Sequence, residues 1–132
     1  MVPVEISRLV IHEGSDEQLI HLRESGEGRI LPLIIGMSEA AALDRILKQR
    51  TLPRPMTHDL FVTALERLQA AVVRAVIDDL RDETYFAKLV LRQQGQELYL
   101  DARPSDAIIL ALLTQAPLFV ADRVMNAMGE MS

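Results

Sequence analysis

The chain has 132 residues, of which 19 are acidic and 14 are basic, so its formal charge near neutral pH is -5. This length predicts one domain over residues 1–132, and a hydrophobic content of 49% is typical of a globular rather than a disordered chain. The absence of cysteine excludes disulfide scaffolds, thiol nucleophiles and cysteine-bound zinc. The acid excess argues against nucleic-acid binding through a broad basic surface, because such binding rests on clustered Lys and Arg.

The longest stretch without Asp, Glu, Lys or Arg covers residues 107–121, which is shorter than the roughly 18 apolar residues of a membrane-spanning helix. The first residues, from Met1 to Glu5, carry no positive side chain and no long apolar run, unlike a secretory signal. We therefore expect a cytoplasmic protein that has no membrane partner.

The pattern of apolar residues predicts three strands in the first third of the chain, over residues 4–12, 17–23 and 30–35. Gly36 ends the third strand, and Ser38 is the expected N-cap of the helix that follows. One face of this helix is apolar and consists of Ala40, Leu43, Ile46 and Leu47.

A loop with Pro53 and Pro55 comes next, since each proline disfavours helix in the residue before it. Thr57 is the expected N-cap of a second helix. The apolar residues of that helix recur with the helical period, at Phe61, Ala64, Leu65 and Leu68.

The second half begins again with three predicted strands, over residues 71–77, 85–91 and 97–101. A helix from Pro104 to about residue 115 is apolar nearly all round, so it is expected to be buried. The remaining elements are a brief extended segment over 117–120 and a final helix over 122–128.

Strands followed by helices, twice over, predict an α+β fold with a mixed, mainly antiparallel sheet and about four helices. The two halves also align without a gap at an offset of 67 residues, where Gly28 meets Gly95 and Glu39 meets Asp106. An internal duplication is therefore a hypothesis, and it requires the same strand order in both halves.

The segment Arg103-Pro104-Ser105-Asp106 lies where a strand gives way to a helix. A helix N-terminus offers free N–H groups to an anion, and Arg103 could add a bidentate phosphate contact. The alternative, which local sequence favours, is that Ser105 or Asp106 only caps the helix.

A second candidate, from Arg54 to Asp59, also lies at a helix start. His58 could transfer protons, and Asp59 could hold a metal or orient the imidazole. Thr57 and Asp59 could equally be capping residues, and a lone His-Asp pair is weak evidence for catalysis.

Glu39 is a third candidate, because a two-fold relation between the halves would bring its carboxylate near that of Asp106. Paired carboxylates suit a hard divalent cation, whereas each alone is only an acid at a helix N-terminus. The acidic cluster Asp78, Asp79, Asp82 and Glu83 is more typical of a solvated turn than of a peripheral cation site.

Two classes of site are missing from the sequence. No glycine-rich phosphate loop is present, and the three histidines lack the spacing of a zinc motif. Most of the few aromatic residues fall at core-like positions, which argues against a base-stacking platform for single strands.

Four segments in the same order and spacing resemble the bifunctional nuclease domain family. They are Leu31-Pro32-Leu33-Ile34-Ile35-Gly36 with Glu39-Ala40, Arg54-Pro55-Met56-Thr57-His58-Asp59-Leu60, Asp101-Ala102-Arg103-Pro104-Ser105-Asp106-Ala107-Ile108 and Ala116-Pro117-Leu118-Phe119-Val120. The resemblance implies an α+β domain that forms a homo-oligomer, a dimer or larger, and for some members the degradation of DNA and RNA. The polar motif positions fall on Glu39, His58, Asp59, Arg103, Ser105 and Asp106. The sequence departs from the pattern at Ile109, Leu113 and Gln115, where a small residue, a cation and a glycine are expected.

The leading hypothesis is therefore a nuclease that cleaves DNA or RNA without sequence preference. In this hypothesis Glu39, Asp59 and Asp106 hold a divalent metal, Mg²⁺ or Mn²⁺, which activates water. His58 transfers protons, while phosphate is bound by Arg54, Arg103 and Ser105. The alternative is a non-catalytic oligomeric binding or regulatory module, in which these residues are caps and ion pairs. Convergence of the candidate residues in one accessible cleft would favour the enzyme.

Overall fold

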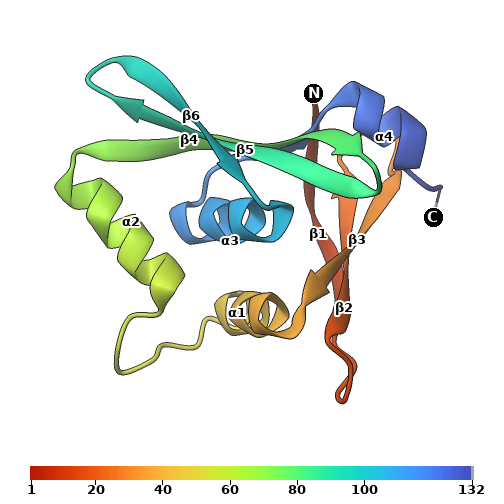
Figure 1. Ribbon diagram of the computed structural model, residues 1–132, viewed down its shortest axis with the longest axis horizontal. Coiled ribbons are helices and arrows are strands. Elements are labelled where there is room, and N and C mark those ends of the chain that lie inside the picture. Colours follow the sequence, from red (N-terminus) through yellow and green to blue (C-terminus); the bar gives the residue numbers. More distant parts are fainter. Residues whose placement is uncertain (132) are drawn as a thin grey trace.

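The computed structural model describes residues 1–131 (Figure 1). Strands and helices follow one another with short connections, apart from the longer loop between the first two helices. The elements are β1 (Val2–Val10), β2 (Glu17–Glu24), β3 (Ile30–Gly36), α1 (Met37–Leu47), α2 (Thr57–Arg67), β4 (Ala70–Arg81), β5 (Thr84–Gln93), β6 (Gln96–Ala102), α3 (Pro104–Thr114), β7 (Leu118–Val120) and α4 (Asp122–Met128).

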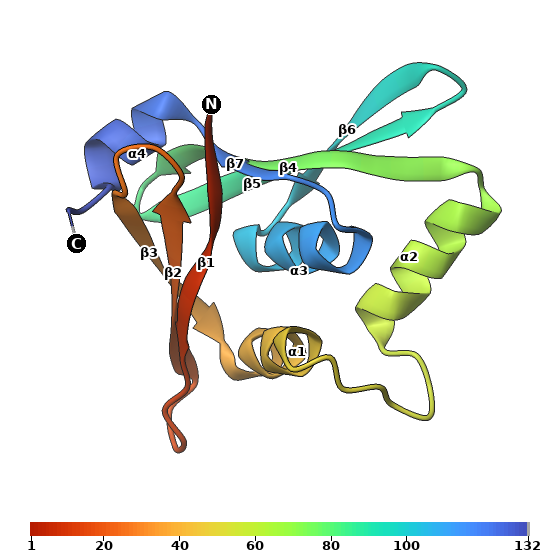
Figure 2. The ribbon, with the colours of Figure 1, turned by 180° about the vertical axis from the view of Figure 1, so that it is seen from behind.

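The seven strands form one sheet in the order β3-β2-β1-β7-β4-β5-β6. All neighbours are antiparallel except β4 and β7, which are parallel. The short strand β7 lies between β1 and β4 and so joins the two halves of the sheet (Figure 2). The predicted α+β fold with a mixed, mainly antiparallel sheet is confirmed, and residues 1–131 contain the four expected helices.

Both halves are a three-stranded antiparallel meander followed by a helix, β1-β2-β3-α1 and β4-β5-β6-α3. Gly28 and Gly95 occupy the turns before the third strand of each meander with φ of 79° and 76°. Side chains other than glycine rarely adopt this left-handed backbone, which explains glycine at both turns. The strand order meets the requirement of the duplication hypothesis, and the duplication itself stays a prediction.

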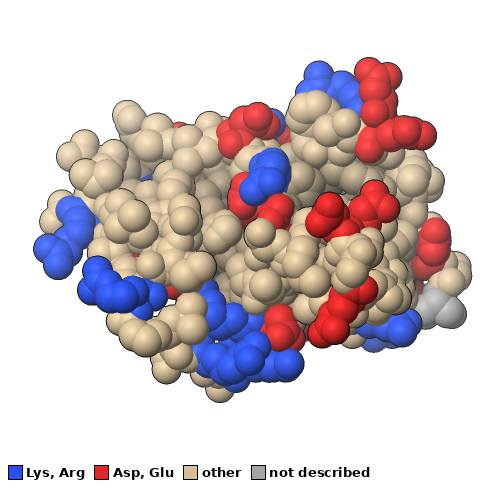
Figure 3. Space-filling view, turned by 60° about the horizontal axis from the view of Figure 1, so that its bottom comes forward, with Lys and Arg blue, Asp and Glu red and all other residues tan. Residues whose placement is uncertain are grey.

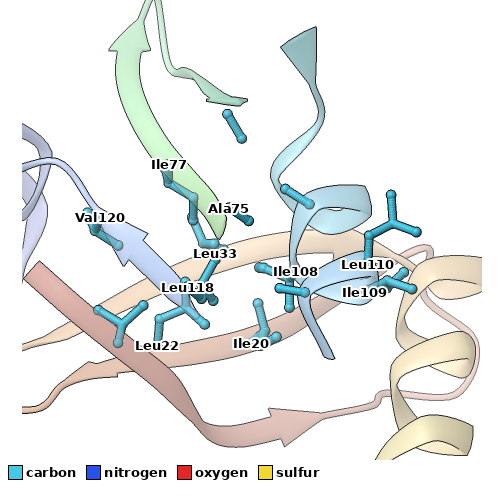
Figure 4. Close-up of a cluster of buried hydrophobic side chains, with 14 of the residues drawn as sticks. Ile20, Leu22, Leu33, Ala75, Ile77, Ile108, Ile109, Leu110, Leu118 and Val120 are labelled. Atoms are coloured by element: carbon cyan, nitrogen blue, oxygen red, sulfur yellow. The ribbon is translucent and has the colours of Figure 1, made fainter. Parts of the chain in front are cut away.

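The two meanders run in different directions, and α1 and α3 lie in the angle between them (Figures 1 and 2). Helix α3 faces both meanders, so its apolar residues are covered on nearly all sides. Ile108 and Ile109 are completely buried there and pack among side chains of both sheet halves, including Ile20, Leu22 and Ile77 (Figure 4). The prediction that this helix is buried is confirmed.

The helix starts differ from the expected caps. The N-cap residues are Gly36, Met56 and Arg103, so Ser38, Thr57 and Ser105 lie inside their helices. Gly36 is also the last residue of β3, and the chain passes from strand to helix without a loop. In α2 the capping function belongs to Asp59, whose Oδ2 accepts a hydrogen bond of 2.9 Å from the backbone N–H of Met56.

Strand β4 continues four residues beyond its predicted end, to Arg81. Asp78 and Asp79 are therefore strand residues, and of the acidic cluster only Asp82 and Glu83 form the turn. Lys88 lies 3.7 Å from Asp78, and Arg81 lies 3.1 Å from Asp79, so both strand acids have basic partners. Within residues 1–131, every helix is too short or too polar to cross a lipid bilayer.

Candidate active site

Three helix N-termini meet at one cluster of polar side chains. Glu39 lies in the first turn of α1, His58 in that of α2, and Asp106 in that of α3, with Arg103 just before α3. Because α1 and α2 both pack against α3, these first turns come within hydrogen-bonding distance. We call Glu39, His58, Arg103 and Asp106 the polar cluster.

Asp106 is the centre of the polar cluster. Its Oδ1 lies 2.9 Å from Nε2 of His58. Arg103 donates from Nε to Oδ2 at 2.9 Å and from Nη2 to Oδ1 at 3.2 Å, which is a bidentate pairing. The third nitrogen of the same guanidinium, Nη1, donates to Oε1 of Glu39 at 3.3 Å. Arg103 therefore bridges the two carboxylates that the sequence predicted would come together.

Gly36 makes room for this arrangement. A Cβ atom at that position would lie 2.9 Å from Oε1 of Glu39, closer than side-chain carbons normally approach. The φ of -74° is open to any residue, so the requirement for glycine is one of space around the Glu39 carboxylate.

The side chains of the polar cluster differ in their access to solvent. Arg103 is 65% exposed, whereas the exposed fractions of Asp106, His58 and Glu39 are 28%, 21% and 17%. Burial opposes the ionisation of Asp106, but hydrogen bonds from Arg103 and His58 outweigh it and hold the pKa of this carboxyl below its usual value. The hydrogen bond to Asp106 raises the pKa of Arg103. The cluster thus combines an ionised carboxylate with a cation that is paired with it and exposed to solvent.

Arg103 stands where three hollows meet. The α2–β6 hollow, of about 680 Å³, extends between α2, α3, β5 and β6 and is lined by His58 and Asp106. The α1–α2 hollow, of about 450 Å³, is lined by Glu39 and Arg45, and the β3 hollow, of about 430 Å³, by Glu39 and Ser105. The polar cluster is therefore accessible from several sides, as a site for an extended substrate requires.

Three predicted site residues lie outside the polar cluster. Asp59 turns toward Arg45, with 3.5 Å between Oδ2 and Nη2, in addition to capping α2. Ser105 is buried with 7% exposure, and Arg54 is exposed in the loop between α1 and α2. The structure thus brings together Glu39, His58, Arg103 and Asp106, and it places Asp59 in a neighbouring ion pair.

Arg45 is a candidate that the sequence motifs did not indicate. It lies in the last turn of α1, where a basic residue is expected only to complement the helix dipole. Its side chain is 15% exposed, contacts Asp59 and lines the α1–α2 hollow. This position results from the packing of α1 beside α2.

The predicted metal ligands are not arranged as a ready ligand set. Among residues 1–131, no group of three or more His, Asp and Glu side chains is placed to hold an ion. The guanidinium of Arg103 contacts the carboxylates of both Glu39 and Asp106, and Asp59 is engaged elsewhere. The geometry alone thus supports proton transfer and anion binding by the chain's own groups.

Comparison with known proteins identifies the family. The sequence model of the bifunctional nuclease domain matches residues 20–132. An uncharacterized protein of Mycobacterium tuberculosis is 32% identical over 131 residues, which cover 98% of this chain and 77% of that protein. Bifunctional nuclease 1 of Oryza sativa subsp. japonica is 30% identical over 104 residues, which cover 76% of this chain but only 31% of the rice protein. The chain therefore belongs to the bifunctional nuclease domain family.

Proposed function

We propose that this protein is a nuclease that hydrolyses phosphodiester bonds of DNA, RNA or both without sequence preference. The observation that carries the proposal is the 2.9 Å contact between His58 and Asp106 beside an exposed arginine. A proton-transfer group, a carboxylate that orients it and a cation for phosphate are the parts that such hydrolysis requires. Family membership and the name of the rice relative support the same chemistry.

The mechanism begins with the tautomer of His58. Ionised Asp106 accepts the Nε2–H of the imidazole, which leaves Nδ1 with a free electron pair. Nδ1 takes a proton from a water molecule as its oxygen attacks phosphorus, and the bond from phosphorus to the leaving sugar oxygen breaks. The leaving sugar oxygen takes a proton from solvent on the opposite side of phosphorus, and the imidazolium releases its proton to solvent. Asp106 stabilises the transient imidazolium by its negative charge.

Arg103 supplies the charge that the reacting phosphate needs. Its planar fork matches two non-bridging phosphate oxygens, and its high exposure lets it turn from Asp106 to the substrate. The negative charge that develops on phosphate during attack is then opposed by the positive charge of the guanidinium. Arg54 and Arg45, with Ser105, are proposed contacts for the neighbouring phosphates of the strand.

Metal assistance by Mg²⁺ or Mn²⁺ at Glu39, Asp59 and Asp106 is a separate proposal, and the steps above do not use it. Cleavage in the presence of a chelator distinguishes a metal-dependent reaction from a metal-independent one. Cleavage that is lost in EDTA and restored by Mg²⁺ or Mn²⁺ would support the metal, whereas undiminished cleavage in EDTA would end that proposal.

Substitution of the polar cluster tests the proposed nuclease. We expect His58→Ala and Asp106→Ala each to reduce cleavage of labelled DNA and RNA oligonucleotides by about 100-fold or more, since proton transfer is lost. Circular dichroism should show an unchanged fold. His12→Ala, in the exposed β1–β2 turn, is the matched control and should cleave like the wild type. Equal cleavage by all variants purified in parallel would assign the activity to a contaminant.

One observation favours the non-catalytic alternative, a binding or regulatory module. The members of the polar cluster pair with one another, as structural ion pairs do. In that case Asp106→Ala should destabilise the fold by several kcal/mol, because it leaves Arg103 and His58 without their shared partner. Loss of cleavage without such destabilisation would reject the alternative.

We also propose that the chain forms a homo-oligomer, a dimer or larger. Large apolar side chains are exposed on α2, at its C-cap and on β6, where Leu60, Leu68 and Tyr99 are each exposed by 60% or more. Such surfaces are typical of interaction sites. Light scattering after size-exclusion chromatography should give a mass of at least twice 14.8 kDa, and a mass of one chain would contradict the proposal.

A further inference from the structure

The α2–β6 hollow has an apolar interior. Its floor is formed by Leu89 and Leu110, which are 1% and 5% exposed, and its walls include Phe61 and Leu100. Its volume of about 680 Å³ lies within the roughly 300–1,000 Å³ typical of small-molecule sites. Leu100 remains 37% exposed at the hollow, although it lies on the face of β6 that points to the core side. The hollow is therefore an apolar surface that the fold leaves uncovered.

The lining of the same hollow also includes polar and charged residues. Arg103 and Asp106 pair with each other there, Asp106 contacts His58, and Thr57 and Asp101 complete the polar lining. A ligand that fills the hollow would thus have an anionic group at Arg103 and a flat or apolar body against the leucines. A nucleotide has this division, because its phosphate is charged while the faces of its base are apolar.

We propose that the α2–β6 hollow binds the base of an unpaired nucleotide whose phosphate lies at Arg103. The inference rests on the proposed nuclease function, and it names the substrate class as single-stranded DNA or RNA. In a duplex the bases are stacked and paired, so a base can enter a hollow only after it leaves the stack. A single strand meets no such cost.

The chemistry of the hollow also fits the proposed lack of sequence preference. The sequence argued against a platform of several aromatic side chains, and the hollow has one ring, that of Phe61, among aliphatic side chains. Apolar walls enclose the faces of any base, whereas selection among bases needs hydrogen bonds to their edges. Enclosure by the hollow thus replaces stacking on a platform.

Binding of a fluorescein-labelled single-stranded oligonucleotide, measured by fluorescence anisotropy, tests the inference. Leu100→Trp places a larger side chain at the hollow, and we expect it to weaken binding about tenfold, since the indole occupies space that the base needs. Leu98→Trp is the matched control, because Leu98 lies two residues earlier on the same strand face with a similar exposure of 42%. Thermal melts of both variants establish that the fold is retained.

The same labelled strand in a blunt duplex should bind the wild type at least about tenfold more weakly. Equal binding of strand and duplex, or equal effects of Leu100→Trp and Leu98→Trp, would overturn the base site. Wild-type hydrolysis of the same labelled single strand, followed by electrophoresis, reports on the proposed nuclease separately. If that hydrolysis is absent while Leu100→Trp still weakens single-strand binding, the base site stands and the nuclease proposal fails.

Discussion

At the scale of single residues, Asp106 holds the polar cluster together. It is the only side chain of the cluster that contacts both His58 and Arg103 within the described residues 1–131. Its ionised form fixes the imidazole tautomer and keeps the guanidinium close to His58. The same contacts that lower the pKa of Asp106 therefore hold the groups that the proposed hydrolysis uses.

The lowered pKa of Asp106 makes a prediction about stability and pH. Because the folded-state pKa lies below the usual value of about 3.9, the ionised carboxylate stabilises the fold above that pH, and this contribution disappears as pH falls through the folded-state pKa. Asp106→Asn should therefore lower the free energy of unfolding by about 1 kcal/mol at neutral pH, because the group is partly solvated. The difference should vanish in strong acid.

Urea unfolding of wild type and Asp106→Asn at several pH values measures this difference. Asp16→Asn, in the exposed β1–β2 turn, is the control and should match the wild type throughout. A difference between Asp106→Asn and wild type that is the same at neutral and acid pH would contradict the assigned ionisation.

At the scale of the elements, the strands and helices could be predicted because their signals are local. Alternation at 85–91 identified β5, and Ala87, Leu89 and Leu91 are buried as that pattern requires. The caps could not be predicted in the same way. Ser38 lies inside α1 because β3 runs directly into the helix at Gly36 and Met37. The packing of distant segments sets this junction, so the local sequence does not reveal it.

Part of the polar cluster could be predicted because some of its residues also have local signals. Glu39, His58 and Asp106 are each marked by a local signal, a polar residue in the first turn of a helix. Their meeting needs the packing of α1 and α2 against α3, and the duplication hypothesis anticipated only the approach of Glu39 and Asp106. The pairing of Asp59 with Arg45 joins two helices across a loop and has no local signal.

The junction of β3 and α1 predicts an effect of Gly36→Ala on substrate binding. The added Cβ would displace the Glu39 carboxylate and leave Arg103 less well held, so KM for an oligonucleotide should rise several-fold. Stability should not fall, because the backbone at Gly36 is open to alanine. Gly26→Ala is the control, since a Cβ there meets nothing within 4 Å. The same KM for both variants would show that Glu39 does not position Arg103.

On the scale of the whole molecule, the acid excess limits how nucleic acid can bind. Figure 3 shows most of the basic side chains at the left and lower left of the viewed face and most of the acidic ones at the centre and right, where a few basic side chains lie among them. The net charge of -5 argues against a broad basic surface, and it leaves the three proposed phosphate contacts Arg45, Arg54 and Arg103 as a limited track for a strand.

This limited track predicts a modest salt dependence of single-strand binding. With Arg103, Arg54 and Arg45 as the phosphate contacts, the plot of log affinity against log salt should have a slope of about -2 between about 50 and 200 mM salt. Arg54→Ala should reduce the slope by about 0.7, the value for one phosphate of a single strand. A wild-type slope steeper than about -5 would indicate a broad basic surface instead.

Chemical rescue of His58→Ala tests most directly whether the polar cluster is the hydrolytic centre. His58 is 21% exposed beside the α2–β6 hollow, so free imidazole can reach the space that its ring leaves. We predict that His58→Ala loses cleavage of a labelled single strand and regains part of it, saturably, when imidazole is added. Undiminished cleavage by His58→Ala before imidazole is added would contradict the assignment of His58 and, with it, of the site.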